Sequence, residues 1–225
     1  MKKRKTLSKL LASCASIAVL VGSLSLNVFA AQTQYVGYDN PRDGFNVFGF
    51  DSDGNMLQTT YNNRGYQTYI SVNGQEQDEV CADDDTFEYD TEYATGDITT
   101  SISAAFDSTE KAVLITYTVH NNGSDSADIR LGSCADCKIG NNDGAPVRAN
   151  GNGLSMTDGT NYFYLIPGNG NFTTTWSGGY GSRYDNVFSN SESHEYNGDS
   201  GLAWSWSFSV PAGGSVSKMA ILFGF

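Results

Sequence analysis

Residues Ala112–His120, AVLITYTVH, decide the fold class of this chain. Valine, isoleucine, threonine and tyrosine fill most of the run, and side chains of these types favour an extended, pleated backbone. The turn-forming residues Asn121–Ser124 follow at once and end the run. The stretch is therefore predicted to be a β-strand.

The same pattern recurs along most of the chain. Short runs rich in Val, Ile, Tyr, Phe and Thr alternate with clusters of Gly, Asn, Asp and Ser. No window of about 12 residues carries the sustained apolar repeat of a helix. Further strands are expected at residues 45–50, 56–61, 66–72, 98–106, 127–132, 162–166, 202–210 and 216–225.

The connections between these strands carry predictions of their own. Asn73-Gly74 is the strongest hairpin signal, because both positions tolerate a positive φ. Residues 127–132 are expected to pair with 112–120, and the last two strands to form a terminal hairpin across residues 211–214. The remaining segments with turn-forming or acidic composition are predicted loops: residues 83–85, 141–146 and 168–193.

About a dozen short strands without helices predict an all-β fold, an antiparallel two-sheet β-sandwich. A single closed barrel and a supersandwich-like arrangement are the alternatives. No repeat of fixed period and no linker divides the chain, so residues 31–225 are predicted to form one domain.

Residues 1–30 have the composition of a secretory signal peptide. Lys2, Lys3, Arg4, Lys5 and Lys9 precede an apolar, serine-containing stretch that ends in Val-Phe-Ala, with cleavage expected before residue 31. A membrane anchor is the alternative, and the stretch is at the lower length limit for one. The mature protein is therefore predicted to be secreted, with no membrane insertion after cleavage.

A second alternative concerns Cys14 within the same segment. The residues before it resemble a lipoprotein box, so this cysteine would carry the lipid if the protein were lipidated. The short apolar stretch in front of it favours cleavage without lipidation.

Removal of the signal peptide makes the chain strongly acidic. Five of the 13 lysines and arginines lie in residues 1–30, and none of the 25 aspartates and glutamates do. The mature chain would carry 8 basic and 25 acidic residues, a net charge of −17. Such a charge repels nucleic-acid phosphates and anionic lipids, which excludes nucleic acid as a partner.

The three cysteines of the mature chain, Cys81, Cys134 and Cys137, are the candidates for disulfide bonding. An odd number allows at most one intramolecular bond, and a bond from Cys81 to one of the other two is the preferred version. Cys134 and Cys137 also form a C-x-x-C pair, which leaves metal binding and redox exchange as alternatives.

Asp51, Asp53 and Asn55 resemble the start of a calcium-binding loop. The full EF-hand pattern requires a glutamate at position 12 of the loop, where this chain has Asn62. A hairpin turn is the favoured interpretation, with Ca²⁺ as a possible ligand because it would offset the negative charge. No other cofactor is predicted.

Aromatic residues in the glycine-rich segment are the main candidates for ligand binding. Trp176, Tyr180 and Tyr184 fall in the predicted loop, where exposed rings could stack on sugars. Trp204 and Trp206 alternate along a predicted strand and are expected to belong to the core instead.

Catalytic residues are harder to identify. A pair of carboxylates could hydrolyse a glycosidic bond, and the candidates are Glu88, Glu92, Asp136, Asp143 and Asp199. Ser200 lies in a short Asp-Ser-Gly string, but neither histidine has the setting of a serine-protease triad. No catalytic residue is therefore assigned.

Four segments resemble a β-sandwich domain of secreted and surface proteins of gut Firmicutes. They are Val113–Ser124, Ala135–Pro146, Asp199–Trp206 and Pro211–Gly213, and the likeness covers roughly residues 85–225. The resemblance implies an extracellular location and a sandwich fold. The strand that ends in asparagine also resembles, more faintly, the galactose-mutarotase-like supersandwich, whose enzymes use a histidine and a carboxylate.

These observations predict a secreted, non-enzymatic binding module for a glycan or a host extracellular protein. A carbohydrate-active enzyme, either a glycoside hydrolase or a mutarotase-like protein, is one alternative. A structural component or adhesin of the cell surface is the other. The ligand and the oligomeric state stay open at this point.

Overall fold

A computed structural model describes residues 36–39, 44–51, 53–81, 87–150, 152–191 and 193–224. The predicted signal peptide, Cys14 and the acidic residues 83–85 lie outside the described residues. Within them, no helix is long and apolar enough to cross a membrane.

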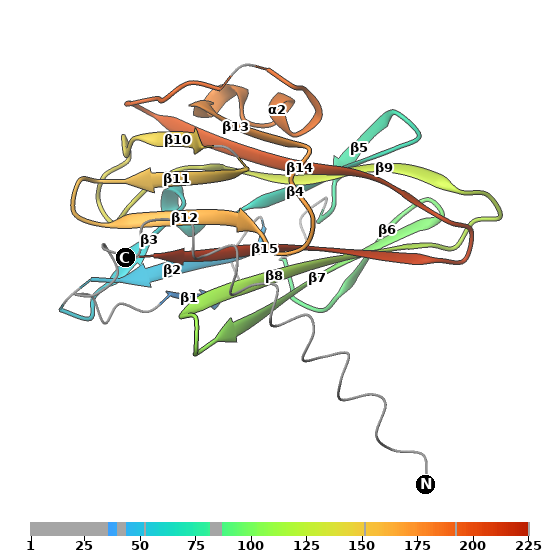
Figure 1. The fold of residues 1–225 in the computed structure, drawn as a ribbon, viewed down its shortest axis with the longest axis horizontal. Coiled ribbons are helices and arrows are strands. Elements are labelled where there is room, and N and C mark those ends of the chain that lie inside the picture. Colours follow the sequence, from blue (N-terminus) through green and yellow to red (C-terminus); the bar gives the residue numbers. More distant parts are fainter. Residues whose placement is uncertain are drawn as a thin grey trace, which may run out of the picture. The chain divides into compact units, whose positions relative to one another are not determined.

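Three antiparallel sheets make up the described fold (Figure 1). In spatial order, the seven-stranded sheet contains β10 (Val147–Asn150), β11 (Gly153–Thr157), β12 (Tyr162–Pro167), β15 (Ser215–Gly224), β8 (Ala112–Asn121), β7 (Ile98–Asp107) and β6 (Glu92–Thr95). The five-stranded sheet contains β13 (Thr174–Gly179), β14 (Ser200–Val210), β9 (Ala127–Asp136), β4 (Gln67–Val72) and β5 (Gln75–Glu79). The smallest contains β1 (Val36–Asp39), β2 (Asn46–Phe50) and β3 (Met56–Gln58).

Helices contribute little to the described chain. The two 3₁₀ turns η2 (Tyr61–Asn63) and η3 (Tyr180–Ser182) and the short helix α2 (Asp185–Phe188) lie in connections between strands. This composition confirms the predicted all-β class.

The two large sheets pack face to face around one core, which confirms the sandwich. Alternate residues of β14 and β8 point into it, and Trp204, Trp206, Ile115 and Tyr117 are almost completely buried there. The Tyr117 hydroxyl lies 2.9 Å from Ser133 Oγ on the facing sheet, so a buried hydrogen bond joins the two layers. The prediction that both tryptophans belong to the core is confirmed.

The turns predicted at residues 73–74 and 51–55 are confirmed. Asn73 and Gly74 have φ values of 52° and 78°, as the hairpin between β4 and β5 requires. The turn at residues 51–55 joins β2 and β3 as expected.

Two predictions of strand pairing are wrong. The segment 127–132 belongs to β9, which pairs with β14 and β4 in the other sheet rather than with β8. The last two strands form no hairpin, because β14 pairs with β9 and β13 whereas β15 pairs with β8 and β12. The turn after Val210 therefore crosses from one sheet to the other.

The predicted loop at residues 168–193 is also wrong in part. Residues 174–179 form β13, which pairs with β14 over its whole length, and α2 follows it. The glycines and serines suggested a loop, but Thr174, Trp176, Ser177 and Gly178 of β13 are buried in the structure.

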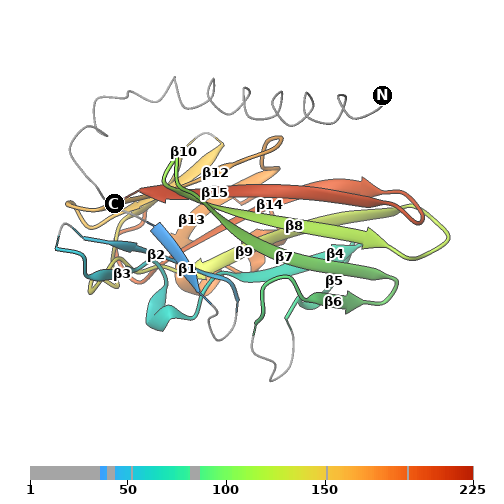
Figure 2. The ribbon, with the colours of Figure 1, turned by 90° about the horizontal axis from the view of Figure 1, so that it is seen from below.

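Within the described residues, the two sides of the sandwich differ in how the edges of the two large sheets are connected. On one side, Val147 and Tyr196 exchange main-chain hydrogen bonds, and Ser177 Oγ accepts from Ala149 N at 2.9 Å, so β10 and β13 are joined. On the other side β5 and β6 are the end strands of the two large sheets, and Figure 2 shows both at the same edge of the sandwich.

Candidate functional site

The outer face of the five-stranded sheet carries a cluster of charged and aromatic side chains where β9 ends. Asp136 pairs with Gly201 of β14, so both residues face outward at the same level. A Cβ atom on Gly201 would lie 2.7 Å from Tyr180 Cα and 3.2 Å from Arg183 Cβ. The absence of a side chain at Gly201 therefore lets the segment with η3 lie directly on the sheet.

Arg183 is held in a fixed position above this face. Its Nη1 donates to the Tyr180 carbonyl at 3.1 Å and its Nη2 to Gln67 Oε1 at 3.2 Å. The guanidinium carbon lies 5.3 Å from the centre of the Tyr180 ring, within cation–π range. Its Nε is buried and has no hydrogen-bond partner. Arg183 thus keeps one donor unused beside an exposed tyrosine.

Acidic side chains lie near the guanidinium. Burial, together with the nearby Asp199 and Asp143, raises the pKa of Asp136 to about 6, while Arg183 and Arg64 act in the opposite direction. Oδ1 of Asp136 and Oδ1 of Asp143 are buried without a hydrogen-bond partner. We call Arg183, Tyr180, Asp136, Asp143 and Asp199 the Arg183 site.

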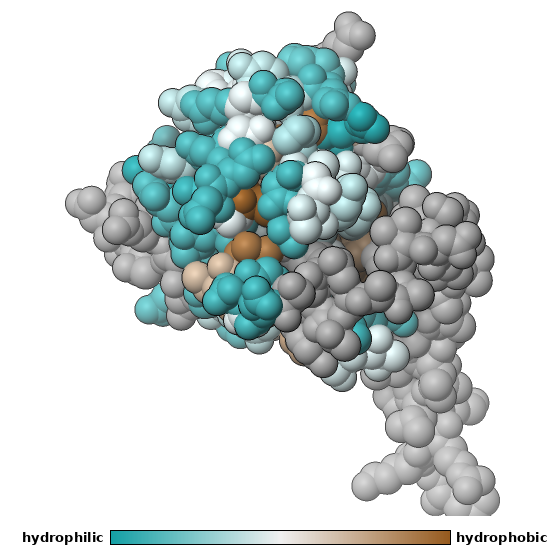
Figure 3. All heavy atoms as spheres, turned by 90° about the vertical axis from the view of Figure 1, so that its left-hand side faces the viewer, coloured by the Kyte–Doolittle hydropathy of each residue, from teal (hydrophilic) through white to brown (hydrophobic). Residues whose placement is uncertain are grey.

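The Arg183 site lies at the end of the sandwich where β14 begins. In Figure 1 this is the left-hand end, since β14 runs from there to its turn with β15 at the right. Figure 3 views that end face on and shows mainly hydrophilic residues around small apolar patches. A polar ligand with some apolar surface matches such a face better than an apolar one.

No protein-family model matches this chain, and no curated protein matches it in sequence. A polysaccharide lyase superposes with a TM-score of 0.53 at 14% sequence identity, covering 85% of this chain and 32% of the lyase. A bacterial glucoamylase complexed with acarbose superposes with a TM-score of 0.53 at 12% identity, covering 86% of this chain and 32% of that enzyme. The likeness is one of fold.

Of the three aromatic residues predicted to bind ligand, the structure brings two to the surface. Tyr180 is 41% exposed. Tyr184 is half-buried, with its ring 4.6 Å from that of Tyr69 and 5.7 Å from that of Phe188. Both belong to the segment that covers the outer face of the five-stranded sheet.

Trp176 is a correction, because it is only 3% exposed. It packs with Cys134, Val187 and Ala203 in a small cluster on the outer face of the sheet, beneath α2. A Cβ on Gly178 would lie 2.3 Å from the Trp176 ring, so the glycine makes room for the ring rather than marking a loop. The prediction of an exposed Trp176 is therefore wrong.

The predicted disulfide is absent. No disulfide joins Cys81, Cys134 and Cys137. Residues three apart on a strand point to opposite faces, and accordingly Cys134 lies in the outer cluster with Trp176 while Cys137 lies in the core between the sheets. The C-x-x-C pair therefore cannot act as one redox or metal site in this fold.

The pKa values of these thiols agree with a structural role. Burial raises the pKa of Cys134 to about 12 and raises that of Cys137 well above its ordinary value. Buried thiols with raised pKa values are poor nucleophiles and poor metal ligands.

The residues of the predicted calcium loop form a hairpin turn. Asp51 Oδ1 accepts from the backbone nitrogens of Asp53 at 2.9 Å and Asn55 at 2.8 Å. Hydrogen bonds from the Asn55 side chain, and then from these backbone groups, lower the pKa of Asp51. The side-chain amide of Asn55 donates to Oδ2 at 3.0 Å. Within the described residues, no three His, Cys, Asp or Glu side chains gather as a metal site. The turn interpretation accounts for the contacts, and Ca²⁺ stays an untested prediction.

The serine-protease alternative has no support from the geometry. Ser200 is fully buried and its Oγ donates to the Ala145 carbonyl at 2.8 Å. His120 Nδ1 lies 2.8 Å from Ser215 Oγ in the other sheet, and the ring of His194 packs 5.8 Å from that of Tyr196. Neither histidine is brought to Ser200 by a hydrogen bond in the described part of the chain.

The five carboxylate candidates for glycoside hydrolysis fall into two groups by position in the fold. Asp136, Asp143 and Asp199, which are far apart in sequence, come close enough to raise one pKa. Glu92 lies on β6, the edge of the other sheet, and Glu88 shortly before it. The sequence offered these five residues without indicating which of them the fold would bring together.

The raised pKa of Asp136 predicts a pH-dependent stability. The folded state keeps the Asp136 proton up to about pH 6, whereas the unfolded chain releases it near pH 4, so this group lowers stability as pH rises through that window. We expect Asp136→Asn to stabilise the fold above pH 6 by on the order of 1 kcal/mol, after allowance for solvent screening of a half-exposed group. The gain should be lost near pH 4.

Urea unfolding at pH 4, 5, 6 and 7.5 measures this effect. Asp128→Asn, at an exposed position of β9, is the matched control and should shift stability little at any pH. A gain that is the same at all four pH values would contradict the assignment of a raised pKa to Asp136.

Proposed function

We propose that this chain is an extracellular carbohydrate-binding module whose binding surface is the Arg183 site. One observation carries the proposal: Arg183 Nε, Asp136 Oδ1 and Asp143 Oδ1 lack hydrogen-bond partners beside a tyrosine ring that is 41% exposed. Buried polar atoms without partners are uncommon in folded proteins, and their clustering beside an open surface is typical of a site that awaits a ligand.

The chemistry of the Arg183 site matches a sugar. Carboxylates accept hydrogen bonds from sugar hydroxyls, and a guanidinium donates to hydroxyl and ring oxygens. The ring of Tyr180 can pack against the C–H face of a pyranose. The site thus combines acceptors, a donor and an apolar plate over a short stretch of surface.

The charge of the chain narrows the class of glycan. The mature chain is strongly acidic, and three of the five residues of the Arg183 site are aspartates. Anionic glycans such as uronates would meet repulsion at this surface. We therefore propose a neutral glycan as the ligand.

Two further observations support the extracellular, carbohydrate-related part of the proposal. Residues 1–30 have the composition of a secretory signal. Two of the solved structures that share the fold are named as a polysaccharide lyase and as a glucoamylase complexed with acarbose. This chain spans 32% of each of those proteins, so the rest of their length has no counterpart in it.

A glycan array probed with residues 31–225 tests the proposal, followed by calorimetric titration with the oligosaccharide retained best. We expect Tyr180→Ala and Arg183→Gln each to weaken binding at least about tenfold, because each removes a central contact. Tyr162→Ala is the matched control, since Tyr162 is also 41% exposed but lies on β12 of the other sheet. The proposal would be refuted if the array retained no neutral glycan, or if Tyr180→Ala and Arg183→Gln both left the affinity unchanged.

Hydrolysis of a glycosidic bond is the second candidate function, and Asp136 favours it. A carboxyl with a pKa of about 6 beside a second carboxyl, Asp199, has the properties of a general acid paired with a base or nucleophile. Release of reducing ends from the retained oligosaccharide would reveal this activity. If the site is catalytic, Asp136→Asn abolishes turnover and leaves binding in place, whereas a binding module shows no turnover at all.

A further inference from the structure

The chain stays extended for a few residues after β9, along the same outer face that carries the Arg183 site. Cys137 and Ile139 are fully buried in the core between the sheets. Asp136 and Lys138 alternate with them and therefore point outward. Residues two apart in an extended chain lie about 7 Å from each other, so Lys138 extends the surface of the Arg183 site by one step.

The turn after β3 lies beside this extension. An antiparallel bridge joins Thr60 to Cys137. In this register Tyr61, the first residue of η2, is the residue opposite Asp136. Burial raises the pKa of Asp136, and Arg64, the residue after η2, is close enough to oppose that rise. The turn with Tyr61 therefore lies next to the Asp136 carboxyl.

Asp136 thus has a tyrosine-bearing turn on each side. On the β14 side it pairs with Gly201, and Tyr180 of η3 lies directly over that glycine. On the opposite side lies Tyr61 of η2. Neighbouring strands are about 4.8 Å apart, so the two turns are separated by about 10 Å across the sheet. This span is wider than a single pyranose ring.

Each of the two tyrosines is paired with a cation. Lys138 Nζ lies 5.4 Å from the centre of the Tyr61 ring. Arg183 has the same relation to Tyr180, at 5.3 Å. Asn63 Oδ1, in the same turn as Tyr61, is buried without a hydrogen-bond partner, as Arg183 Nε is on the other side. We call Tyr61, Asn63 and Lys138 the Tyr61 subsite, because they repeat the ring, acceptor and donor of the Arg183 site.

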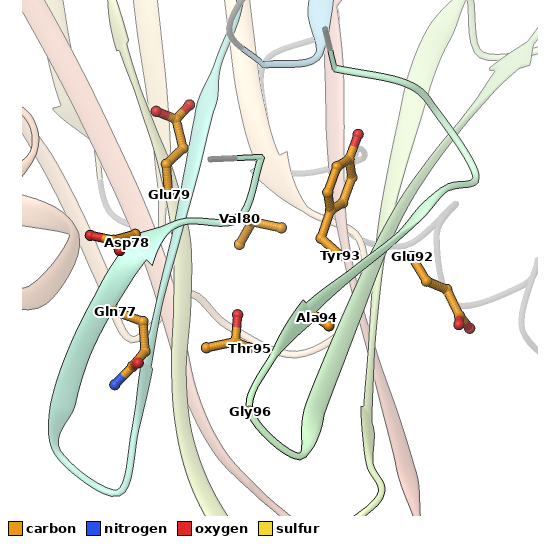
Figure 4. Close-up of a pocket in the computed structure, with 9 residues that line it drawn as sticks. All are labelled: Gln77, Asp78, Glu79, Val80, Glu92, Tyr93, Ala94, Thr95 and Gly96. Atoms are coloured by element: carbon orange, nitrogen blue, oxygen red, sulfur yellow. The ribbon is translucent and has the colours of Figure 1, made fainter. Parts of the chain in front are cut away.

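A groove of about 480 Å³ between β5 and β6 serves as a comparison. Figure 4 shows the carboxylates of Glu79 and Glu92 pointing away from the space between the strands, whereas Thr95 lies within it. No lysine or arginine is among the residues that line this groove, so it contains no cation–ring pair. We assign it no ligand and use it as a control location.

We propose that the Tyr61 subsite binds a second sugar unit of the same glycan, so that the ligand is a neutral oligosaccharide of at least two units. This inference rests on the function proposed for the Arg183 site. One unit packs on the Tyr180 ring and the next on the Tyr61 ring, where Lys138 donates to a hydroxyl oxygen. The linkage between the two units then crosses Asp136, whose carboxyl accepts from the neighbouring hydroxyl groups.

Calorimetric titration of residues 31–225 with neutral oligosaccharides of one to four units tests the proposal. The probes are the homo-oligosaccharides of glucose, mannose, galactose and xylose, together with any neutral glycan retained on the array. Tyr61→Ala and Lys138→Gln alter the Tyr61 subsite, whereas Tyr61→Phe keeps the ring. Lys218→Gln is the matched control, because Lys218 Nζ lies 5.1 Å from the centre of the Phe208 ring in a like pair elsewhere. Thr95→Val removes a hydroxyl group from the groove between β5 and β6.

We expect at least one disaccharide to bind at least about tenfold more tightly than its monosaccharide. Tyr61→Ala should remove that gain and leave the affinity for the monosaccharide within about twofold, since the monosaccharide occupies the Arg183 site. Lys138→Gln should reduce the gain as well, and it carries the same test if Tyr61→Ala fails to fold. Tyr61→Phe, Lys218→Gln and Thr95→Val should bind like the unmodified chain.

The possible failures are distinguishable. If no neutral sugar of any length binds, this inference falls together with the function proposed for the Arg183 site. It falls alone if Tyr180→Ala weakens binding but longer sugars bind no more tightly than monosaccharides, or if Tyr61→Ala and Lys138→Gln leave the gain unchanged. Equal weakening of monosaccharide and disaccharide by Tyr61→Ala would also overturn it, because both tyrosines would then contact one sugar unit.

Discussion

Trp204→Ala is expected to lower the free energy of unfolding by about 3–5 kcal/mol, the largest single effect in this chain. Trp204 is fully buried at the centre of the core. Its ring lies 5.6 Å from that of Tyr66, 6.3 Å from that of Phe45 and 6.4 Å from that of Phe172. Truncation would leave a cavity that β-strands on both sides cannot close, because their register is fixed by the ladders.

Thermal and urea unfolding measure this loss. For a domain of this size, 3–5 kcal/mol corresponds to a fall in Tm of roughly 6–20 °C. Trp204→Phe is the matched control, since it keeps an aromatic ring in the cluster and should lose less than half as much. A fall of less than about 1 kcal/mol for Trp204→Ala would show that the two sheets do not share the core described above.

Arg130→Met is expected to have the second largest effect, through the segment that carries the Arg183 site. The Arg130 guanidinium donates to the carbonyls of Val187 at 2.8 Å and Ser189 at 2.7 Å, and to Thr174 Oγ1 at 2.9 Å. Methionine retains the length of the side chain but none of these donors. We expect a loss of about 2–3 kcal/mol, because several partly buried acceptors lose their partner at once.

Arg130→Met should also destabilise the segment with η3 and α2 locally, beyond its effect on the free energy of global unfolding. Hydrogen exchange of the backbone amides in η3 and α2 is expected to accelerate at least about tenfold, because this segment opens more readily than the sheets beneath it. Affinity for the glycan should fall with it. Arg148→Met is the matched control: Arg148 forms an exposed ion pair with Glu195 and should change stability by less than about 1 kcal/mol. Unchanged exchange in α2 would contradict the role assigned to Arg130.

The parts of the fold set by nearby residues could be predicted from the sequence. The hairpin at Asn73-Gly74 and the strand at Ala112–His120 follow from turn chemistry and from side-chain type, which act over a few residues. The class follows in turn, since such strands without helices must stack their apolar faces.

Strand partners could not be predicted in the same way. The turn at residues 211–214 fits a hairpin and a crossing between sheets equally well in composition. The actual partners are distant in sequence: β14 pairs with β9 and β15 pairs with β8, across separations of 65 to 111 residues. Long-range pairing of this kind leaves no local pattern.

The cysteine prediction is one that the sequence could have corrected. Cys134 and Cys137 follow the strand expected at residues 127–132, and a continuation of that strand places residues three positions apart on opposite faces. Trp176 is different, because its burial depends on α2 and on Gly178, neither of which has a recognisable signal in a glycine-rich stretch. Of the Arg183 site, Tyr180, Asp136, Asp143 and Asp199 were predicted only as separate candidates, and Arg183 was not predicted. The three aspartates come near one another through the pairing of β9 with β14, which the sequence does not indicate.

A crystal structure of residues 31–225 with the array-selected oligosaccharide tests the central claim most directly. Density for a sugar ring is expected over Tyr180, with hydroxyl groups within hydrogen-bond distance of Arg183 and Asp136. An oligosaccharide bound elsewhere, with the surface around Arg183 unoccupied, would contradict the account.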